Sequence, residues 1–175
     1  SFECYNGVFN RLTKSFMAGI YLHIPFCKRK CAYCDFYSVA NTKFIDAFVD
    51  VLLKEIELQK NYLGIEKVQT IYFGGGTPSM LKPNHIEKIL NKIYQHFNID
   101  SNNEITLEAN PDDLKLDYLK AIKKIGINRL SVGIQSFQEK DLVLMKRQHT
   151  VKQSQRAILD AQSVGFNNIS VDLIY

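Results

Sequence analysis

Residues 19–34 read Gly-Ile-Tyr-Leu-His-Ile-Pro-Phe-Cys-Lys-Arg-Lys-Cys-Ala-Tyr-Cys, a short apolar run followed by a loop with three cysteines. The run Gly19–Ile24 has the length and apolar content of a buried strand. The cysteines that follow it have the spacing C-x3-C-x2-C. The segment therefore predicts a strand whose carboxyl end carries three thiols.

On the carboxyl side of this segment, short apolar runs alternate with longer amphipathic ones. Such alternation predicts parallel βαβ units, which build either an open doubly wound sheet or a (β/α) barrel. In both architectures the site lies at the carboxyl ends of the strands. The further strands are predicted at Val68–Phe73, Glu104–Ala109, Asn128–Ile134 and Ile169–Ile174, and the helices at Lys43–Lys60, from Pro83 to Phe97, at Leu116–Ile125 and at Val151–Val164.

Length and composition are those of one globular α/β domain. The chain has 175 residues, of which 46% are hydrophobic and 23% charged. Its net charge is only +4 and its basic residues are dispersed, which argues against a nucleic-acid partner. No apolar run is long enough to cross a membrane, and residues 1–16 lack the pattern of a signal peptide. We therefore expect a cytoplasmic protein with no membrane insertion.

Two expectations concern the ends of the sequence. Residues 1–16 match no element of the α/β pattern, so we expect a leader outside a domain that spans residues 17–175. The pattern stops on its fifth strand, which would normally need a covering helix and a neighbour. We therefore expect a domain truncated at its carboxyl end.

The cysteine loop has the composition of a metal site. In a reducing compartment, three closely spaced cysteines favour metal binding over disulfides. Cys27, Cys31 and Cys34 could bind three irons of a [4Fe–4S] cluster and leave the fourth iron without a protein ligand. A structural zinc site completed by His23 or Cys4 is the alternative.

Polar and glycine residues follow each later strand. Gly74-Gly75-Gly76-Thr77-Pro78 comes after the second strand, where bare backbone could approach a ligand or form a plain turn. Glu108, Gln135 and Asp172 lie at or near the ends of the next three strands, and Arg147 lies in the connection that follows Gln135. Arg147 could pair with a carboxylate, but each of these residues could also have only a structural role.

The order of these motifs resembles the radical SAM superfamily. Tyr21-Leu-His-Ile-Pro-Phe-Cys27 is similar to the oxygen-independent coproporphyrinogen III oxidase group, which includes a heme-chaperone branch. The resemblance runs from Met17 to Tyr175. It implies a partial (β/α)6 barrel that binds a [4Fe–4S] cluster and S-adenosylmethionine, with reductive cleavage of S-adenosylmethionine as its chemistry.

The resemblance also implies roles for single residues. The glycine turn would contact the amino group of the methionine moiety, and Tyr33 would shield the cluster from solvent. The residues implied to bind S-adenosylmethionine or to lie beside it are Tyr21, Gly74, Gly75, Gly76, Thr77, Glu108, Gln135, Arg147 and Asp172.

One departure favours the heme-chaperone branch. The oxidase pattern has a further cysteine two residues after the third ligand, whereas here Cys34 is followed by Asp35 and Phe36. We therefore expect a heme chaperone that binds and transfers heme, with coproporphyrinogen III oxidase as the alternative. The implied partners are heme or a porphyrinogen, and an electron donor such as flavodoxin or ferredoxin. His85, His96 and His149 lack a ligand pattern and are predicted to lie on the surface.

Overall fold

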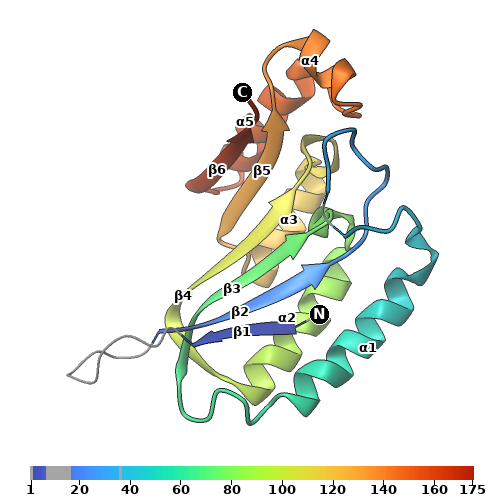
Figure 1. Ribbon diagram of the computed structural model, residues 1–175. Helices are drawn as coiled ribbons and strands as arrows, with labels where there is room; N and C mark the ends of the chain where they lie inside the picture. Colours follow the sequence, from blue (N-terminus) through green and yellow to red (C-terminus); the bar gives the residue numbers. More distant parts are fainter. Residues whose placement is uncertain (1, 7–16, 36) are drawn as a thin grey trace.

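A computed structural model describes residues 2–6, 17–35 and 37–175 (Figure 1). The strands of these residues form one sheet in the order β1-β2-β3-β4-β5-β6. The five strands from β2 onward are mutually parallel, and β1 pairs antiparallel with β2. The bounds are Phe2–Asn6 for β1, Ala18–Ile24 for β2, Lys67–Gly75 for β3, Asn98–Ala109 for β4, Arg129–Gln135 for β5 and Asn168–Leu173 for β6.

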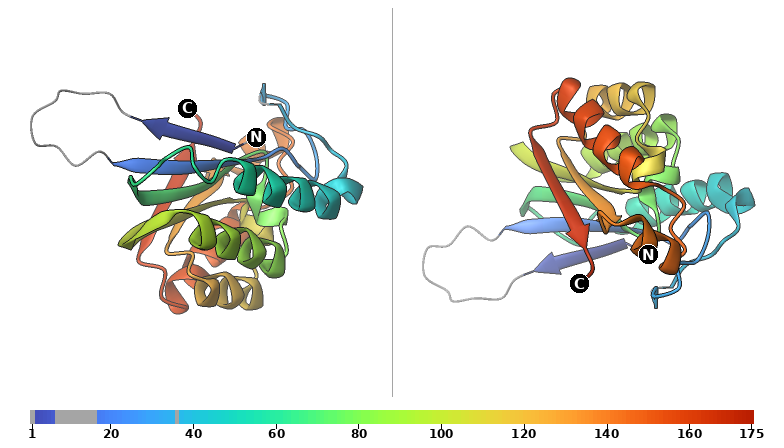
Figure 2. Two further views of the ribbon diagram at one scale, coloured as in Figure 1. Left: turned by 90° about the horizontal axis from the view of Figure 1, so that it is seen from below. Right: turned by 90° about the horizontal axis from the view of Figure 1, so that it is seen from above.

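The helices cover one face of this sheet, as two further views show (Figure 2). Doubly wound folds reverse their strand order and carry helices on both faces. Here the strand order follows the chain, so the fold is a partial (β/α)6 barrel. The helices are α1 (Ile45–Leu58), α2 (Pro83–His96), α3 (Leu116–Ile125), α4 (Glu139–Leu144) and α5 (Val151–Ser163), with 3-10 turns η1 (Thr42–Phe44), η2 (Pro78–Met80) and η3 (Pro111–Asp113).

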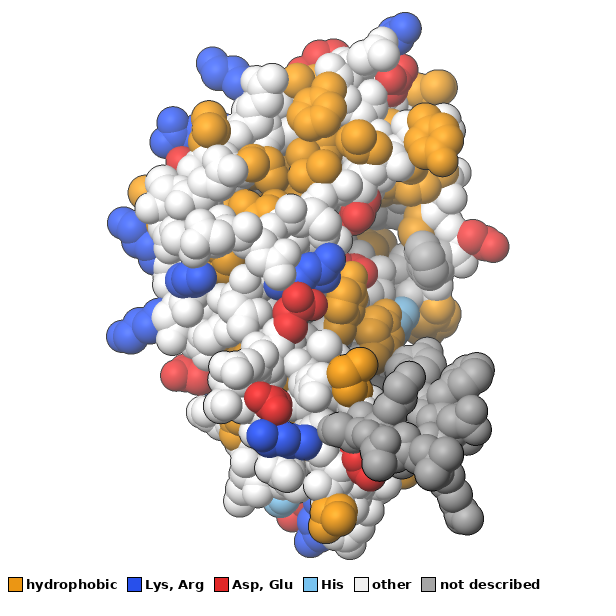
Figure 3. Space-filling model, turned by 90° about the vertical axis from the view of Figure 1, so that its left-hand side faces the viewer, with side chains coloured by type: hydrophobic (Ala, Val, Ile, Leu, Met, Phe, Trp, Pro, Cys, Tyr) orange, Lys and Arg blue, Asp and Glu red, His pale blue; other side chains and the backbone are white. Residues whose placement is uncertain are grey.

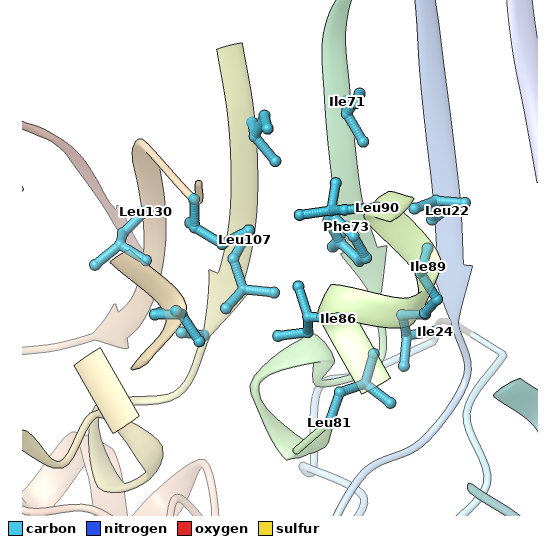
Figure 4. Packing of buried hydrophobic residues seen from close by; sticks show 14 of the residues in the cluster. Leu22, Ile24, Ile71, Phe73, Leu81, Ile86, Ile89, Leu90, Leu107 and Leu130 are labelled. Carbon is cyan, nitrogen blue, oxygen red and sulfur yellow. The ribbon is translucent and has the colours of Figure 1, made fainter. Parts of the chain in front are cut away.

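Alternation along the strands separates the core from the site. On β2, Leu22 and Ile24 are fully buried on the helix side, while Tyr21 and His23 are only partly buried. Figure 4 shows the same packing across the sheet, where strand side chains meet residues of α2. The labelled core residues are Leu22, Ile24, Ile71, Phe73, Leu81, Ile86, Ile89, Leu90, Leu107 and Leu130, all with 1% of their surface exposed or less. The opposite face carries polar side chains.

The last strand in the sheet order has several exposed apolar side chains. Val171 and Leu173 of β6 expose 42% and 49% of their surfaces, and Ile174 directly after the strand exposes 45%. Figure 3, which views the molecule from the left of Figure 1, shows hydrophobic side chains gathered toward the upper end of this face. Edge strands of this kind are open to pairing with a further strand.

The predicted strands and helices are all present, and two helices have well-defined ends. Gly126 ends α3 in the left-handed conformation, with φ of 114°. Thr150 and Gln153 form the capping box that begins α5. Periodicity had located these elements because their apolar positions face one common core.

Three elements differ from the prediction. β4 begins at Asn98 instead of Glu104, and the six-residue helix α4 lies within the predicted connection 135–150. Phe2–Asn6 forms β1, so part of the expected leader pairs with the sheet. Residues 7–16 lie outside the described residues, and the domain boundary at residue 17 stays a prediction.

Two of the three histidines expected on the surface are buried. His85 is 6% exposed, and its Nε2 lies 2.9 Å from the Asp46 carboxylate. His149 is 3% exposed and its Nε2 lies 3.0 Å from the Ile134 carbonyl oxygen. Burial lowers the pKa of His149. The surface assignment was therefore wrong for both residues, because each finds a partner in a distant segment.

Phe73→Ala is expected to destabilise the metal-free protein by about 3–5 kcal/mol. The Phe73 side chain is fully buried between β3 and the helices, so its removal leaves a cavity. Val51→Ala on the exposed side of α1 is the control and should cost about 0.5 kcal/mol or less. Urea unfolding measures both variants, and equal losses would contradict this assignment of the core.

Candidate functional site

The carboxyl ends of the parallel strands surround a cavity of about 410 Å³. Eleven of the thirteen residues predicted for the site line it: Cys27, Cys31, Tyr33, Cys34, Gly75, Gly76, Thr77, Glu108, Gln135, Arg147 and Asp172. Tyr21 and Gly74 do not line it. They lie against each other next to it, because a Cβ on Gly74 would come within 2.8 Å of the Tyr21 ring.

The cysteine loop is held at both its ends. The Val39 N–H donates to Pro25 at 2.6 Å, and the Cys27 N–H donates to Val39 at 3.2 Å. Farther along, the Ala32 N–H donates to the Met145 carbonyl at 3.4 Å. Cys27 is buried, whereas Cys31 and Cys34 are partly exposed. The three thiols therefore differ in their access to solvent, although they line one cavity.

The glycine turn after β3 packs directly against this loop. The Gly76 N–H donates to Ile24 at 2.8 Å and the Thr77 N–H donates to Phe26 at 2.7 Å. A Cβ on Gly76 would lie 2.7 Å from the Phe26 carbonyl oxygen and 3.0 Å from the Cys27 sulfur. Only glycine permits this approach without displacing the backbone that carries Cys27.

Glu108 closes one side of the cavity. Its carboxylate accepts from the Tyr72 hydroxyl at 2.7 Å and from the Gly75 N–H at 3.1 Å. Burial raises the pKa of Glu108, the two hydrogen bonds act in the opposite direction, and the nearby Asp172 raises it further. A cationic ligand group in the cavity would relieve this excess of negative charge.

Arg147 joins the cysteine loop to the strand ends. Its Nη1 donates to the Cys31 sulfur at 3.4 Å and to the Tyr33 hydroxyl at 3.5 Å. Its Nη2 donates to the Gly133 carbonyl at 2.7 Å. The buried Nε has no hydrogen-bond partner within the described part of the chain. The guanidinium nevertheless lines the cavity and brings a full positive charge to it, which a ligand carboxylate could use.

Several site residues were not found by sequence reasoning. Tyr72 orients Glu108, Ser131 donates to Asp172 at 3.3 Å, and Asn110 accepts from Arg147 at 2.6 Å. Asn110 follows Glu108 closely in Glu-Ala-Asn-Pro, so its position after a strand was a signal that could have been used. Tyr72 and Ser131 carried no such signal, because their partners lie on other strands.

Lys28 also has a role that its sequence context did not reveal. It lies between Cys27 and Cys31 and forms ion pairs with Asp112 and Asp113 of η3. Asp113 in turn accepts from the Ser79 hydroxyl at 2.7 Å. The ion pairs connect the cysteine loop to the turns that follow β3 and β4.

The donor set of the cavity fits a cluster with one open iron. Three thiols line the cavity together with the glycine turn and Arg147. Three thiolates are enough to bind three of the four irons of a cubane cluster. In the described residues, no three His, Cys, Asp or Glu side chains are grouped around one point as ligands of a single ion. Thiolates that bind different irons do not need to converge in that way, whereas a tetrahedral zinc site does.

These features define the class of protein. The family model of the Radical SAM superfamily matches residues 21–175, and the chain belongs to this superfamily. Within it, the chain falls in the group that contains HemW and HemN.

Curated relatives include "Heme chaperone HemW" from several bacteria. The Buchnera aphidicola protein (from Acyrthosiphon pisum) is 39% identical over 158 residues, which is 89% of this chain and 42% of that protein. The Lactococcus lactis protein is 40% identical over 156 residues, or 89% of this chain and 40% of that protein. The Escherichia coli protein is 35% identical over 158 residues. The chain thus spans about two fifths of these relatives' length.

Solved structures share the fold. Escherichia coli coproporphyrinogen III oxidase (HemN), a radical SAM enzyme, is similar with a TM-score of 0.83 and 28% identity, over 91% of this chain and 37% of that one. The protein anSMEcpe with bound AdoMet has a TM-score of 0.57 at 18% identity, over 84% of this chain and 40% of that one. The second likeness supports the fold alone.

Gly76→Ala is expected to reduce iron binding. The added Cβ would meet the Phe26 carbonyl and the Cys27 sulfur, and such overlap costs about 1–3 kcal/mol, which corresponds to about 5- to 150-fold in affinity. Iron and sulfide per chain after anaerobic reconstitution measure the effect.

Gly64→Ala is the matched control. A Cβ there would meet nothing within 4 Å, and its φ of 58° adds backbone strain without reaching the cavity. It should lower stability slightly and leave iron binding unchanged. Equal iron loss in both variants would contradict a specific role for the glycine turn.

Proposed function

We propose that this chain is the cluster- and S-adenosylmethionine-binding core of a heme chaperone. The observation that carries this proposal is the single cavity in which three thiols meet the glycine turn and Arg147. The relatives named heme chaperone, at 35–40% identity over 89% of the chain, support the choice of branch. Asp35 and Phe36 after Cys34 agree with it, since the oxidase pattern has a cysteine at the second of these positions.

In this proposal Cys27, Cys31 and Cys34 bind a [4Fe–4S] cluster. The cluster, when reduced, supplies the electron that cleaves S-adenosylmethionine. Lys28 holds the loop in place through Asp112 and Asp113. Tyr33, which is 43% exposed, covers the loop on its solvent side.

The other predicted residues would bind S-adenosylmethionine. Arg147 offers a guanidinium to its carboxylate, and the backbone of the glycine turn faces its amino group. Glu108 accepts from ammonium or hydroxyl groups, because burial has left its carboxylate incompletely compensated. Gln135 and Asp172 line the same cavity, while Tyr21 packs against Gly74 of the glycine turn next to it.

The partners follow from this function. Heme would be the transferred ligand, and an electron donor such as flavodoxin or ferredoxin would reduce the cluster. No helix among the described residues could span a membrane. A cytoplasmic location, a domain of residues 17–175 and the lack of a nucleic-acid partner remain predictions.

Coproporphyrinogen III oxidation is the second candidate, favoured by the similarity to HemN at a TM-score of 0.83. The two functions differ in their products. An oxidase decarboxylates a porphyrinogen while it consumes S-adenosylmethionine, whereas a chaperone passes unchanged heme to an acceptor protein. Analysis of porphyrins by chromatography therefore separates them.

Cys31→Ala is expected to abolish the cluster and the release of 5′-deoxyadenosine. The parent protein should bind about four irons per chain after anaerobic reconstitution. It should release 5′-deoxyadenosine with dithionite and S-adenosylmethionine, and it should transfer heme without porphyrinogen decarboxylation. Cys4→Ala is the matched control, since it removes the one cysteine outside the loop. A Cys31→Ala protein that keeps its iron would contradict the ligand assignment, and decarboxylation by the parent would favour the oxidase.

A further inference from the structure

Asn110 lies between Arg147 and Thr77, and both ends of its amide are hydrogen-bonded. Arg147 Nη2 lies 2.6 Å from Oδ1, and Nδ2 lies 3.3 Å from the Thr77 hydroxyl oxygen. A guanidinium group has donors only, so the Asn110 atom that faces it must be the oxygen. The amide nitrogen therefore faces Thr77 and donates to it.

This orientation determines to which atom the Thr77 hydroxyl can donate its hydrogen bond. Its oxygen accepts the bond from Asn110, and the single hydroxyl proton needs another acceptor. The Cys27 sulfur lies 3.5 Å from this oxygen, and Thr77 is 5% exposed, so water has little access. The Thr77 hydroxyl therefore donates its hydrogen bond to the Cys27 sulfur.

The backbone around Asn110 keeps its side chain in this position. The Asn110 N–H donates to the Ser79 hydroxyl at 3.2 Å, and the residue is followed by Pro111, which restricts its backbone. Arg147, on the other side of the amide, also donates to Cys31 at 3.4 Å. Donors to two of the three thiols therefore converge on this one amide.

We propose that Asn110 is a positioning residue that directs the Thr77 hydroxyl onto Cys27 and thereby raises the reduction potential of the cluster. Hydrogen bonds to ligand sulfurs stabilise the more negative, reduced state. The inference rests on the proposed function, in which Cys27 is a cluster ligand. It adds to that function a residue of the cavity wall whose effect on Cys27 is exerted through Thr77.

Asn110→Asp reverses the hydrogen bond with little change of shape. A carboxylate still accepts from Arg147, but it also accepts the Thr77 proton, which then leaves Cys27. Because the new charge lowers the potential as well, the substitution is compared in two backgrounds. In Thr77→Val the hydroxyl is absent, so only the effect of the charge remains.

The experiment is a spectroscopic redox titration of the reconstituted full-length protein and its variants. Thr77→Val should lower the midpoint potential, and Thr77→Ser, which keeps the hydroxyl, should stay near the parent value. Asn110→Asp should lower the potential more in the parent than in Thr77→Val. Equal shifts in both backgrounds, or a Thr77→Val potential equal to that of the parent, would overturn the proposal.

A second measurement needs no cluster. In the metal-free protein, urea unfolding of Asn110→Ala, Thr77→Val and the double variant should show a coupling free energy that differs from zero. Additive losses would overturn the Asn110–Thr77 interaction. A parent protein that binds no cluster would instead refute the proposed function, so the two failures are distinguishable.

Discussion

The hydrogen bonds from Gly76 and Thr77 to the carbonyl groups of Ile24 and Phe26 are the contacts on which the site depends. They hold the turn after β3 against the start of the cysteine loop, at a distance that leaves no room for a side chain on Gly76. Cys27 is buried at this junction, and Thr77 reaches it from the turn. These two hydrogen bonds therefore fix the position of Cys27 relative to the strand ends.

The parallel register extends the same arrangement across the sheet. β3 pairs with β4 and β4 with β5 in parallel register toward their carboxyl ends, so Gly75, Glu108 and Gly133 come to the same edge although they are far apart in the sequence. Gly75 and Glu108 then make a polar contact across the two strands, and the Gly133 carbonyl accepts from Arg147. A barrel sheet thus brings groups from successive strands to one edge, where the cysteine loop meets them.

Sequence periodicity predicted the elements well where one apolar face meets one core. The β2 alternation and the stripe of Val49, Leu52 and Ile56 in α1 are such cases, because burial repeats with the period of the element. α4 was missed since only Leu142 of its six residues is buried, which leaves no repeat to detect. β1 was missed because it pairs with an edge strand through backbone groups, and these carry no sequence signal.

The residues of the site also fall into those that the sequence identified and those that it did not. Spacing and resemblance identified the thiols, the glycine turn and Arg147, all of which carry chemistry that few other residue types could supply. The residues that orient them were not identified, because their effect depends on partners distant in sequence: Lys28 is 85 positions from Asp113, and Arg147 is 37 from Asn110. Substitutions at the orienting residues should therefore change the orientation of the thiols, the glycine turn and Arg147 without removing these groups. These substitutions leave the packed core intact, because the core lies on the helix side of the sheet and the polar contacts lie at the strand ends and on the other face.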